Sequence, residues 1–276
     1  MHDIAFKLGP LTVHWYGILV ALGFLAGLWT ASRRAQLVGI PPERVFDLGP
    51  WLILGGIAGG RILYIISYWN EEFAAHPFPL VLKIWEGGLI FYGGLIGATL
   101  AAMYYLHWKK LPMWKMGDVL APSVALGSAF GRLGCLMHGC CFGRVCGAGL
   151  PWGIQFPNGS PAWDKQHEDG LVGALAPSLP VHPTELYDSL LNFCFYLFLA
   201  WLFRRRKFDG QVFAIYLIGY AILRSFVEYF RGDYPVHYLG GIATPAQVVS
   251  IGIILGGVLL LCLLPRPQPQ PIEKKA

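Results

Sequence analysis

Long apolar stretches recur along the chain and are separated by shorter polar connections. A helix needs about 20 residues to cross the roughly 30 Å hydrocarbon layer of a membrane. Seven stretches reach about that length, at residues 13–31, 46–67, 87–106, 119–137, 185–203, 211–230 and 246–264. The pattern predicts an all-α integral membrane protein with seven transmembrane helices.

The polar segments predict how the chain is divided. We expect residues 1–264 to form a single membrane domain. Its longest connection, 138–184, lies between the fourth and fifth predicted helices and is expected to form a small subdomain outside the membrane. The last segment, 265–276, reads PRPQPQPIEKKA, a composition typical of a disordered tail.

Lys and Arg in the connections predict the orientation. The two alternating sets of connections and tails contain 5 and 13 of these residues. Cytoplasmic connections carry the excess of positive side chains. We therefore expect the N-terminus outside, the 138–184 subdomain in the periplasm, and the C-terminal tail in the cytoplasm.

Composition supports the membrane class and excludes two others. The chain is 55% hydrophobic and 13% charged, whereas soluble domains carry roughly 25% charged residues. An aromatic content of 14% argues against intrinsic disorder. A basic face toward anionic lipid explains the net charge of +5, so we expect membrane lipids and no nucleic acid as partners.

Three arginines interrupt the apolar stretches: Arg61, Arg132 and Arg224. Each costs about 2.5–3.5 kcal/mol at the centre of a membrane helix. Glu228 follows Arg224 by four residues, so the two can pair on one helix face. A single arginine could reach a headgroup or cap helix carbonyls. Three together favour a shared polar cavity that binds an anion such as a lipid phosphate, which guanidinium groups bind through paired hydrogen bonds.

Other polar and aromatic side chains are expected near the outer ends of these helices. They are His14, Tyr16, Tyr92, His182, Glu185 and Tyr220. Tyr220 precedes Arg224 by four residues, so Tyr220, Arg224 and Glu228 share one helix face. Each aromatic residue alone fits a membrane–water interface, and each histidine alone fits a solvated loop.

A set of motifs in a fixed order resembles a known family. The motifs are HWYG at 14–17, GGRILY at 59–64, WEGGLIFYGGLIG at 85–97, GRLG at 131–134 followed by Gly143, HPTELYD at 182–188, and GYAILRSFVEYFR at 219–231. Over nearly its whole length the chain resembles the prolipoprotein diacylglyceryl transferases, bacterial inner-membrane enzymes with seven transmembrane helices and an outer N-terminus. The resemblance implies transfer of the diacylglyceryl group of phosphatidylglycerol to the lipobox cysteine thiol of a prolipoprotein, with release of glycerol 1-phosphate.

The resemblance also implies roles for particular residues. Arg132 and Arg224 would hold and polarise the lipid phosphate, Glu228 would orient Arg224, and Tyr220 would form a hydrogen bond beside it. Tyr92 completes the expected catalytic set. The expected lipid-binding residues are Tyr16, His14, Arg61, Cys135, Cys140, Gly143, Gly93 and Gly94. We expect phosphatidylglycerol and prolipoprotein signal peptides as partners, a monomer, no cofactor and no assigned metal ion.

The chain departs from the family pattern at three positions. Cys135 and Cys140 stand where the family has Asn and Glu, and Tyr92 stands where it has the His often proposed as base. Tyrosine has a pKa near 10, which makes it a poor base unless a nearby arginine lowers that pKa. His138, His182 or a tyrosinate at Tyr92 are the open candidates for the base.

Four cysteines are clustered with His138 at the outer end of the fourth predicted helix: Cys135, Cys140, Cys141 and Cys146. On the outer side of the membrane disulfides persist, so a disulfide from Cys146 to Cys140 or Cys141 is the first expectation. Free thiols packed as small apolar groups and a bound metal ion are the alternatives. The spacing fits zinc sites only loosely.

Three other functions are weighed against the transferase. A membrane thiol oxidoreductase would use the Cys135–Cys146 cluster, but it leaves the buried arginines unexplained and the chain has no C-x-x-C motif. An anion transporter would be favoured by internal repeats, and the sequence contains no convincing one. A paralogue that kept the lipid site but changed its acceptor would explain the substitutions at Tyr92, Cys135 and Cys140.

Overall fold

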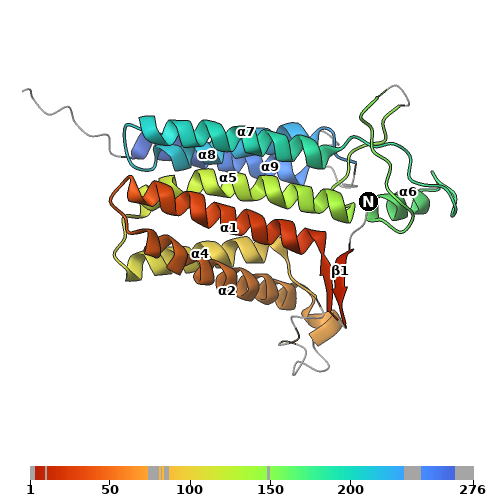
Figure 1. The fold of residues 1–276 in the computed structure, drawn as a ribbon, viewed down its shortest axis with the longest axis horizontal. Coiled ribbons are helices and arrows are strands. Elements are labelled where there is room, and N and C mark those ends of the chain that lie inside the picture. Colours follow the sequence, from red (N-terminus) through yellow and green to blue (C-terminus); the bar gives the residue numbers. More distant parts are fainter. Residues whose placement is uncertain are drawn as a thin grey trace, which may run out of the picture. The chain divides into compact units, whose positions relative to one another are not determined.

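The computed structural model describes residues 4–9, 11–73, 81, 83, 87–147, 150–232 and 244–264. Its long helices follow the predicted apolar stretches closely (Figure 1). They are α1 (Trp15–Gln36), α2 (Pro42–Ser67), α4 (Phe91–Trp108), α5 (Met113–His138), α7 (Thr184–Arg205), α8 (Gln211–Glu228) and α9 (Pro245–Leu263). The predicted tail 265–276 lies outside the described residues.

Six of these helices are long and apolar enough to cross a membrane, in a search confined to the described residues. Helix α4 is the one that falls short, because its 18 residues include glycines, tyrosines and His107. The chain is therefore a mostly helical, multi-pass membrane protein. The seventh span and the orientation stay predictions.

The apolar pattern did not predict the hairpin that precedes the first helix. Strands β1 (Ile4–Leu8) and β2 (Leu11–His14) pair in antiparallel register, with Phe6 opposite Val13. Gly9 adopts a φ of 59° at the turn, a conformation that glycine reaches without steric cost. As a result the first helix begins at Trp15 rather than at the expected residue 13.

The chain divides into two compact units, residues 1–30 with 117–276 and residues 31–116. In the first unit α1, α5, α7, α8 and α9 lie side by side (Figure 1). Hydrogen bonds join these helices directly: Ser123 donates to the Gly27 carbonyl at 2.6 Å, and Ser189 donates to the Ala129 carbonyl at 2.9 Å. Buried polar side chains thus fix neighbouring helices against one another.

A buried carboxylate in the second turn of α5 joins that helix to the start of α8. Asp118 of α5 is fully buried and accepts hydrogen bonds from the backbone N–H groups of Gly210 and Phe213, at 2.8 and 2.9 Å. Arg206 lies 3.5 Å from the same carboxylate. Since the first N–H groups of a helix have no partner within it, Asp118 supplies the cap that α8 lacks in its own sequence.

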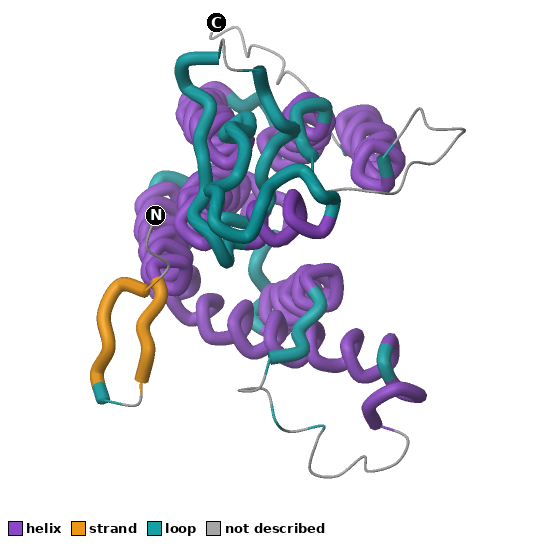
Figure 2. Tube along the Cα trace, turned by 90° about the vertical axis from the view of Figure 1, so that its right-hand side faces the viewer, coloured by secondary structure: helices purple, strands orange, loops and turns teal. Residues whose placement is uncertain are grey.

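Loops and the short helix α6 (Pro161–Glu168) lie across the opposite end of this unit, where α5 ends and α7 begins (Figure 2). They enclose a small apolar core of Leu136, Phe142, Phe156, Ala162 and Val181. Backbone bridges from Val181 to Val145 and to Ile154 connect the two ends of the segment. The described part of 138–184 is therefore packed, while its periplasmic location stays a prediction.

The second unit is built on close contact between α2 and α4. Glycines on both helices face one another, and a Cβ atom added at Gly59 or Gly93 would collide with the backbone of the other. Gly97 meets the Gly55 carbonyl oxygen in the same way. Small residues allow membrane helices to approach until their backbones touch.

We expect Gly97→Ala to destabilise this helix pair, because the new methyl group has no space beside Gly55. Overpacking of this kind costs about 1–3 kcal/mol. Thermal unfolding in detergent measures the effect. Gly256→Ala in α9 is the matched control, since a Cβ there meets no atom within 4 Å. Equal unfolding temperatures for the two variants would contradict the close packing of α2 against α4 at Gly97.

Candidate active site

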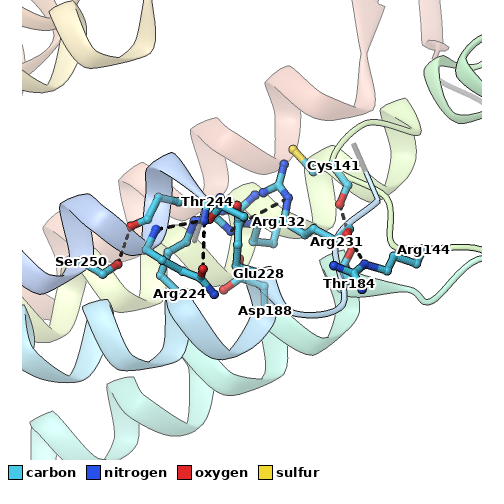
Figure 3. Close-up of polar contacts among 12 residues, drawn as sticks. Arg132, Cys141, Arg144, Thr184, Asp188, Arg224, Glu228, Arg231, Thr244 and Ser250 are labelled. Carbon is cyan, nitrogen blue, oxygen red and sulfur yellow. Dashed lines mark hydrogen bonds and ion pairs between the residues drawn. The ribbon is translucent and has the colours of Figure 1, made fainter. Parts of the chain in front are cut away.

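The first feature of the candidate site is an ion pair between two helices. Arg132 of α5 contacts Asp188 of α7, with 2.7 Å between Nε and Oδ2 (Figure 3). The Asp188 side chain is 6% exposed, and Asn192 one turn later donates a 2.6 Å hydrogen bond to its Oδ1. The carboxylate therefore holds the Arg132 guanidinium in a fixed position between α5 and α7.

A second group of charges lies at the end of α8. The pairing expected from helical spacing is confirmed, with 2.7 Å between Arg224 Nη1 and Glu228 Oε2. Arg231, just beyond the helix, places its Nε 3.9 Å from the same Glu228 oxygen (Figure 3). The Glu228 side chain is only 1% exposed, so one buried carboxylate faces two guanidinium groups.

Backbone contacts gather three chain segments around these charges. The Gly143 N–H donates to the His182 carbonyl at 3.1 Å, and the Arg144 N–H donates to the Phe230 carbonyl at 2.8 Å. The Arg144 side chain also donates to the Arg231 carbonyl. A Cβ at residue 143 would collide with the His182 carbonyl oxygen, so this position needs glycine. A lipid contact at Gly143 stays a prediction.

Positive charge exceeds negative charge in this cluster. Its charged residues are Arg132, Arg144, Arg224, Arg231, Glu185, Asp188 and Glu228. Arg231 lies near the other parts of the cluster, since its charge attracts Glu185 and repels Arg132. Arg144 is exposed, whereas the ion pairs place three guanidinium groups, Arg132, Arg224 and Arg231, against the two carboxylates Asp188 and Glu228, which leaves capacity for one further anion. A phosphate suits guanidinium groups particularly well because it accepts two parallel hydrogen bonds.

Glu185 is the least compensated carboxyl group in the cluster. Its side chain is 1% exposed. Among the described residues its Oε1 has no hydrogen-bond partner, and Oε2 accepts only a long 3.5 Å bond from Thr184. A buried polar atom without a partner is costly, which marks this carboxyl group as a candidate for substrate contact.

The end of α5 brings three thiols together. Gly139 takes a left-handed φ of 80°, and the Cys140 N–H donates back to the Cys135 carbonyl at 3.2 Å. This turn folds the chain over the last turn of the helix. The sulfur atoms of Cys135, Cys140 and Cys141 then lie within 4.8 Å of one another.

The expected disulfide with Cys146 is not formed, because all six cysteines are free. Cys146 belongs to a bridged backbone segment in which its N–H donates to the Pro180 carbonyl at 2.8 Å. Its buried sulfur lies beside Gly153. The backbone pairing thus directs Cys146 into the loop core, outside the group of three thiols.

Neighbouring groups shift the pKa values of the Cys140 and Cys141 thiols in opposite directions. Hydrogen bonds from Cys135 and Cys140, reinforced by Arg231 and Arg132, lower the pKa of the Cys141 thiol. Hydrogen bonds with Cys135 and Cys141, together with burial, raise the pKa of the Cys140 thiol. Negative charge in the group is therefore favoured at Cys141.

Several expected residues border this site within the same unit. Tyr16 packs on Gly134, and its ring centroid lies 6.4 Å from that of His138. The His182 ring lies 5.5 Å from Phe230 and its Nδ1 is 3.4 Å from the Tyr187 hydroxyl. Tyr220 stacks on Tyr216, and His14 is exposed at the end of β2. Their roles in catalysis or lipid binding stay predictions.

The other expected residues belong to the second unit. Arg61 donates to the carbonyl oxygens of Val81, Gly87 and Gly88, at 2.9–3.2 Å. Its described contacts therefore fix a loop, because Val81, Gly87 and Gly88 all precede α4, and they are not the helix carbonyls of the capping alternative. Tyr92 is 55% exposed. Gly93 packs against α2, and Gly94 lies near the Gly56 carbonyl. A shared cavity and lipid contacts for these residues stay predictions.

Three members of the charged cluster were not predicted from the sequence. Arg144 and Arg231 lie in the connections after α5 and α8, and the three-residue spacing from Glu228 to Arg231 is the one helical signal between these charges. Asp188 lies within the HPTELYD motif, and its partner Arg132 is distant in the chain. The helical spacing from Asp188 to Asn192 was the available local signal.

Comparisons with known proteins identify the family. The family model described as prolipoprotein diacylglyceryl transferase matches residues 3–263. A phosphatidylglycerol–prolipoprotein diacylglyceryl transferase of Vibrio vulnificus is 36% identical over 262 residues, covering 94% of this chain and 89% of the relative. Relatives of the same name from Trichormus variabilis and Erwinia tasmaniensis are 35% and 34% identical. They align with 96% and 99% of this chain and with 90% and 95% of their own lengths. The chain belongs to the prolipoprotein diacylglyceryl transferase family.

Proposed function

We propose that this chain transfers the diacylglyceryl group of phosphatidylglycerol to the lipobox cysteine thiol of prolipoproteins, forming a thioether and releasing glycerol 1-phosphate. The names of its relatives specify this donor and acceptor class. The observation that carries the proposal is the excess of three largely buried guanidinium groups over the two buried carboxylates Asp188 and Glu228. The same relatives leave a thiol oxidoreductase without support.

The positive charge of the guanidinium groups can stabilise the leaving group of this reaction. The acceptor sulfur attacks the glycerol carbon that bears the phosphate, a sulfur–carbon bond forms, and the carbon–oxygen bond to the phosphate breaks. Negative charge grows on the departing phosphate ester. Arg132 and Arg224 are held in place by Asp188 and Glu228, so they stabilise that charge without having to reorganise.

The remaining roles belong to the same proposal. Tyr16, His14, Tyr220 and Gly143 would line the lipid site, and Arg61, Gly93 and Gly94 are proposed separately as lipid contacts. Tyr92, His138 and His182 are the candidates for the base. We place the protein in the bacterial inner membrane as a monomer, with its N-terminus outside and residues 138–184 in the periplasm. In support, the hairpin, the start of α1 and the loops after α5 lie at one end of the first unit (Figure 1).

Complementation of a strain depleted of its own transferase tests the function. We expect this chain to restore growth and thioether lipidation of a reporter lipoprotein. Arg224→Ala should lower lipidation at least about 100-fold, since a fixed charge opposite the leaving group is lost. Arg204→Ala is the matched control, because it removes an exposed arginine at the far end of α7 and should change nothing.

The result that would overturn the proposal is equally specific. If the unmutated protein is well inserted and does not lipidate the reporter, the chain uses another acceptor. Replacing the lipobox cysteine of the reporter by serine must abolish the product, because the thioether requires the sulfur. Vesicles with phosphatidylethanolamine in place of phosphatidylglycerol should not support the reaction.

A further inference from the structure

The group of three thiols has the dimensions of a metal site. The sulfur atoms of Cys135, Cys140 and Cys141 lie within 4.8 Å of one another. Three thiolates at about 2.3 Å from a tetrahedral ion are separated by about 3.8 Å. Small side-chain rotations are enough to reach that separation.

The backbone is already arranged for this group. The turn at Gly139 brings Cys140 back over Cys135, which compensates for the unusual spacing between the two residues. Cys141 adopts a φ of 68°, a left-handed conformation that costs a residue with a side chain about 1–2 kcal/mol. The Thr184 hydroxyl donates to the Cys141 carbonyl at 2.8 Å and stabilises this conformation (Figure 3). The three sulfurs therefore lie close together before any ion arrives.

The surrounding charge is of the right sign. Three thiolates around a divalent cation carry a net charge of −1. Arg132 and Arg231 both interact electrostatically with Cys141, and Arg132 also interacts with Cys135. Arg231, which has no role at the phosphate in the proposed function, can balance this negative complex, which would otherwise be costly in a partly buried site.

The three thiols would leave one coordination position of a tetrahedral metal ion open. Among the described residues it contains three ligands, and the sulfur of Cys146 is not one of them. Structural zinc sites are closed by four protein ligands, whereas catalytic zinc sites have three and keep the fourth position for water or substrate. The three cysteines are partly exposed, so an incoming group can reach them.

We propose that Cys135, Cys140 and Cys141 bind a thiophilic divalent ion of the Zn²⁺ class, and that its fourth position binds the acceptor cysteine as a thiolate. The second half of this inference rests on the proposed function. A free cysteine is only about a few per cent thiolate at pH 7, and the metal-bound form of a thiol is the thiolate.

The bound thiolate gives a balanced reaction. The acceptor thiol transfers its proton to a hydroxide in the open position, water leaves, and the sulfur coordinates the ion. Its electron pair then forms the bond to the glycerol carbon, while the electrons of the broken carbon–oxygen bond remain on glycerol phosphate. The ion is neither oxidised nor reduced.

Metal content tests the site directly. We expect protein purified under reducing conditions and reconstituted with Zn²⁺ to retain about one ion per chain. Cobalt substitution should give a thiolate-to-metal charge-transfer band. Cys141→Gly and Cys140→Ser should weaken binding at least tenfold. Glycine at residue 141 accepts the left-handed backbone, so the first variant should fold normally. Cys194→Ser, which changes an exposed cysteine on α7, is the control and should bind as the unmutated protein does.

An acceptor peptide tests the open position. A lipobox peptide should shift the cobalt spectrum, and the same peptide with serine for cysteine should not. Chelation should reduce lipidation at least tenfold, and Zn²⁺ should restore it.

The results of these experiments distinguish failure of the metal site from failure of the transferase function. Full lipidation by metal-free protein, or undiminished metal binding by Cys141→Gly, overturns the metal site and leaves the transferase intact. A protein recovered with a disulfide in the group and no bound ion also overturns the site. Metal binding without any lipidation overturns the transferase and the acceptor role, and supports the site alone.

Discussion

Replacing Arg132 by alanine is expected to reduce lipidation of a reporter prolipoprotein by about 10²–10³-fold, the usual loss when one fixed donor to a developing oxyanion is removed. Arg132 lies between α5 and α7 and is paired at 2.7 Å with Asp188. No other arginine is held by that carboxylate in the described residues. Initial rates with phosphatidylglycerol vesicles and a lipobox peptide measure the loss.

A second variant separates catalysis from folding. Arg132→Ala alone leaves Asp188 buried without its cation, and breaking a buried pair costs about 3–5 kcal/mol. Arg132→Ala combined with Asp188→Asn removes the stranded charge, so it should recover most of the thermal stability. Activity should remain lost. If the double variant regains activity along with stability, Arg132 has only a structural role.

Glu228→Ala is expected to have the second large effect. The substitution leaves Arg224 and Arg231 facing each other without the carboxylate between them. Loss of about 3–5 kcal/mol of folding free energy is the usual cost of an unpaired buried charge. Lipidation should fall as well, because Arg224 loses its fixed position. Thermal unfolding and initial rates measure the two effects.

The thermal stability of Glu228→Ala should also depend on the lipid headgroup. An anionic headgroup can partly replace the missing carboxylate, so phosphatidylglycerol nanodiscs should stabilise Glu228→Ala more than they stabilise the unmutated protein. Asp209→Ala is the control, since that carboxylate is 45% exposed and lies 3.7 Å from Arg206. Unchanged unfolding of Glu228→Ala would show that the buried pair contributes no stability.

The sequence was most informative about the long helices. An apolar stretch of about 20 residues has few alternatives to a membrane helix. The ends of the long helices lie within six residues of their expected bounds, with the largest difference at the start of α5. The hairpin was missed because its second strand, Leu11–His14, is continuous with the apolar residues of α1. Periodicity cannot divide so short a segment from the helix that follows.

The sequence predicted those contacts of the site that join residues close together in the chain, and it did not predict contacts between distant residues. Arg224 and Glu228 belong to one helix, so their spacing alone predicts the pair. Arg132 and Asp188 belong to different helices, and only the packing of α5 on α7 brings them together. The thiols illustrate the same limit, because the turn at Gly139 selects Cys135 as the neighbour of Cys140 and excludes Cys146.

The shared carboxylate of Asp118 has a consequence for the distant arginines. It anchors the start of α8 to α5, so neither helix can slide along the other without breaking buried hydrogen bonds. Measured from this anchor, Arg132 is about 21 Å along α5 and Arg224 about 17 Å along α8, at 1.5 Å per residue. The hydrogen bonds of Asp118 at one end of the two helices therefore keep the Arg132 and Arg224 guanidinium groups at similar distances along their helices near the other end.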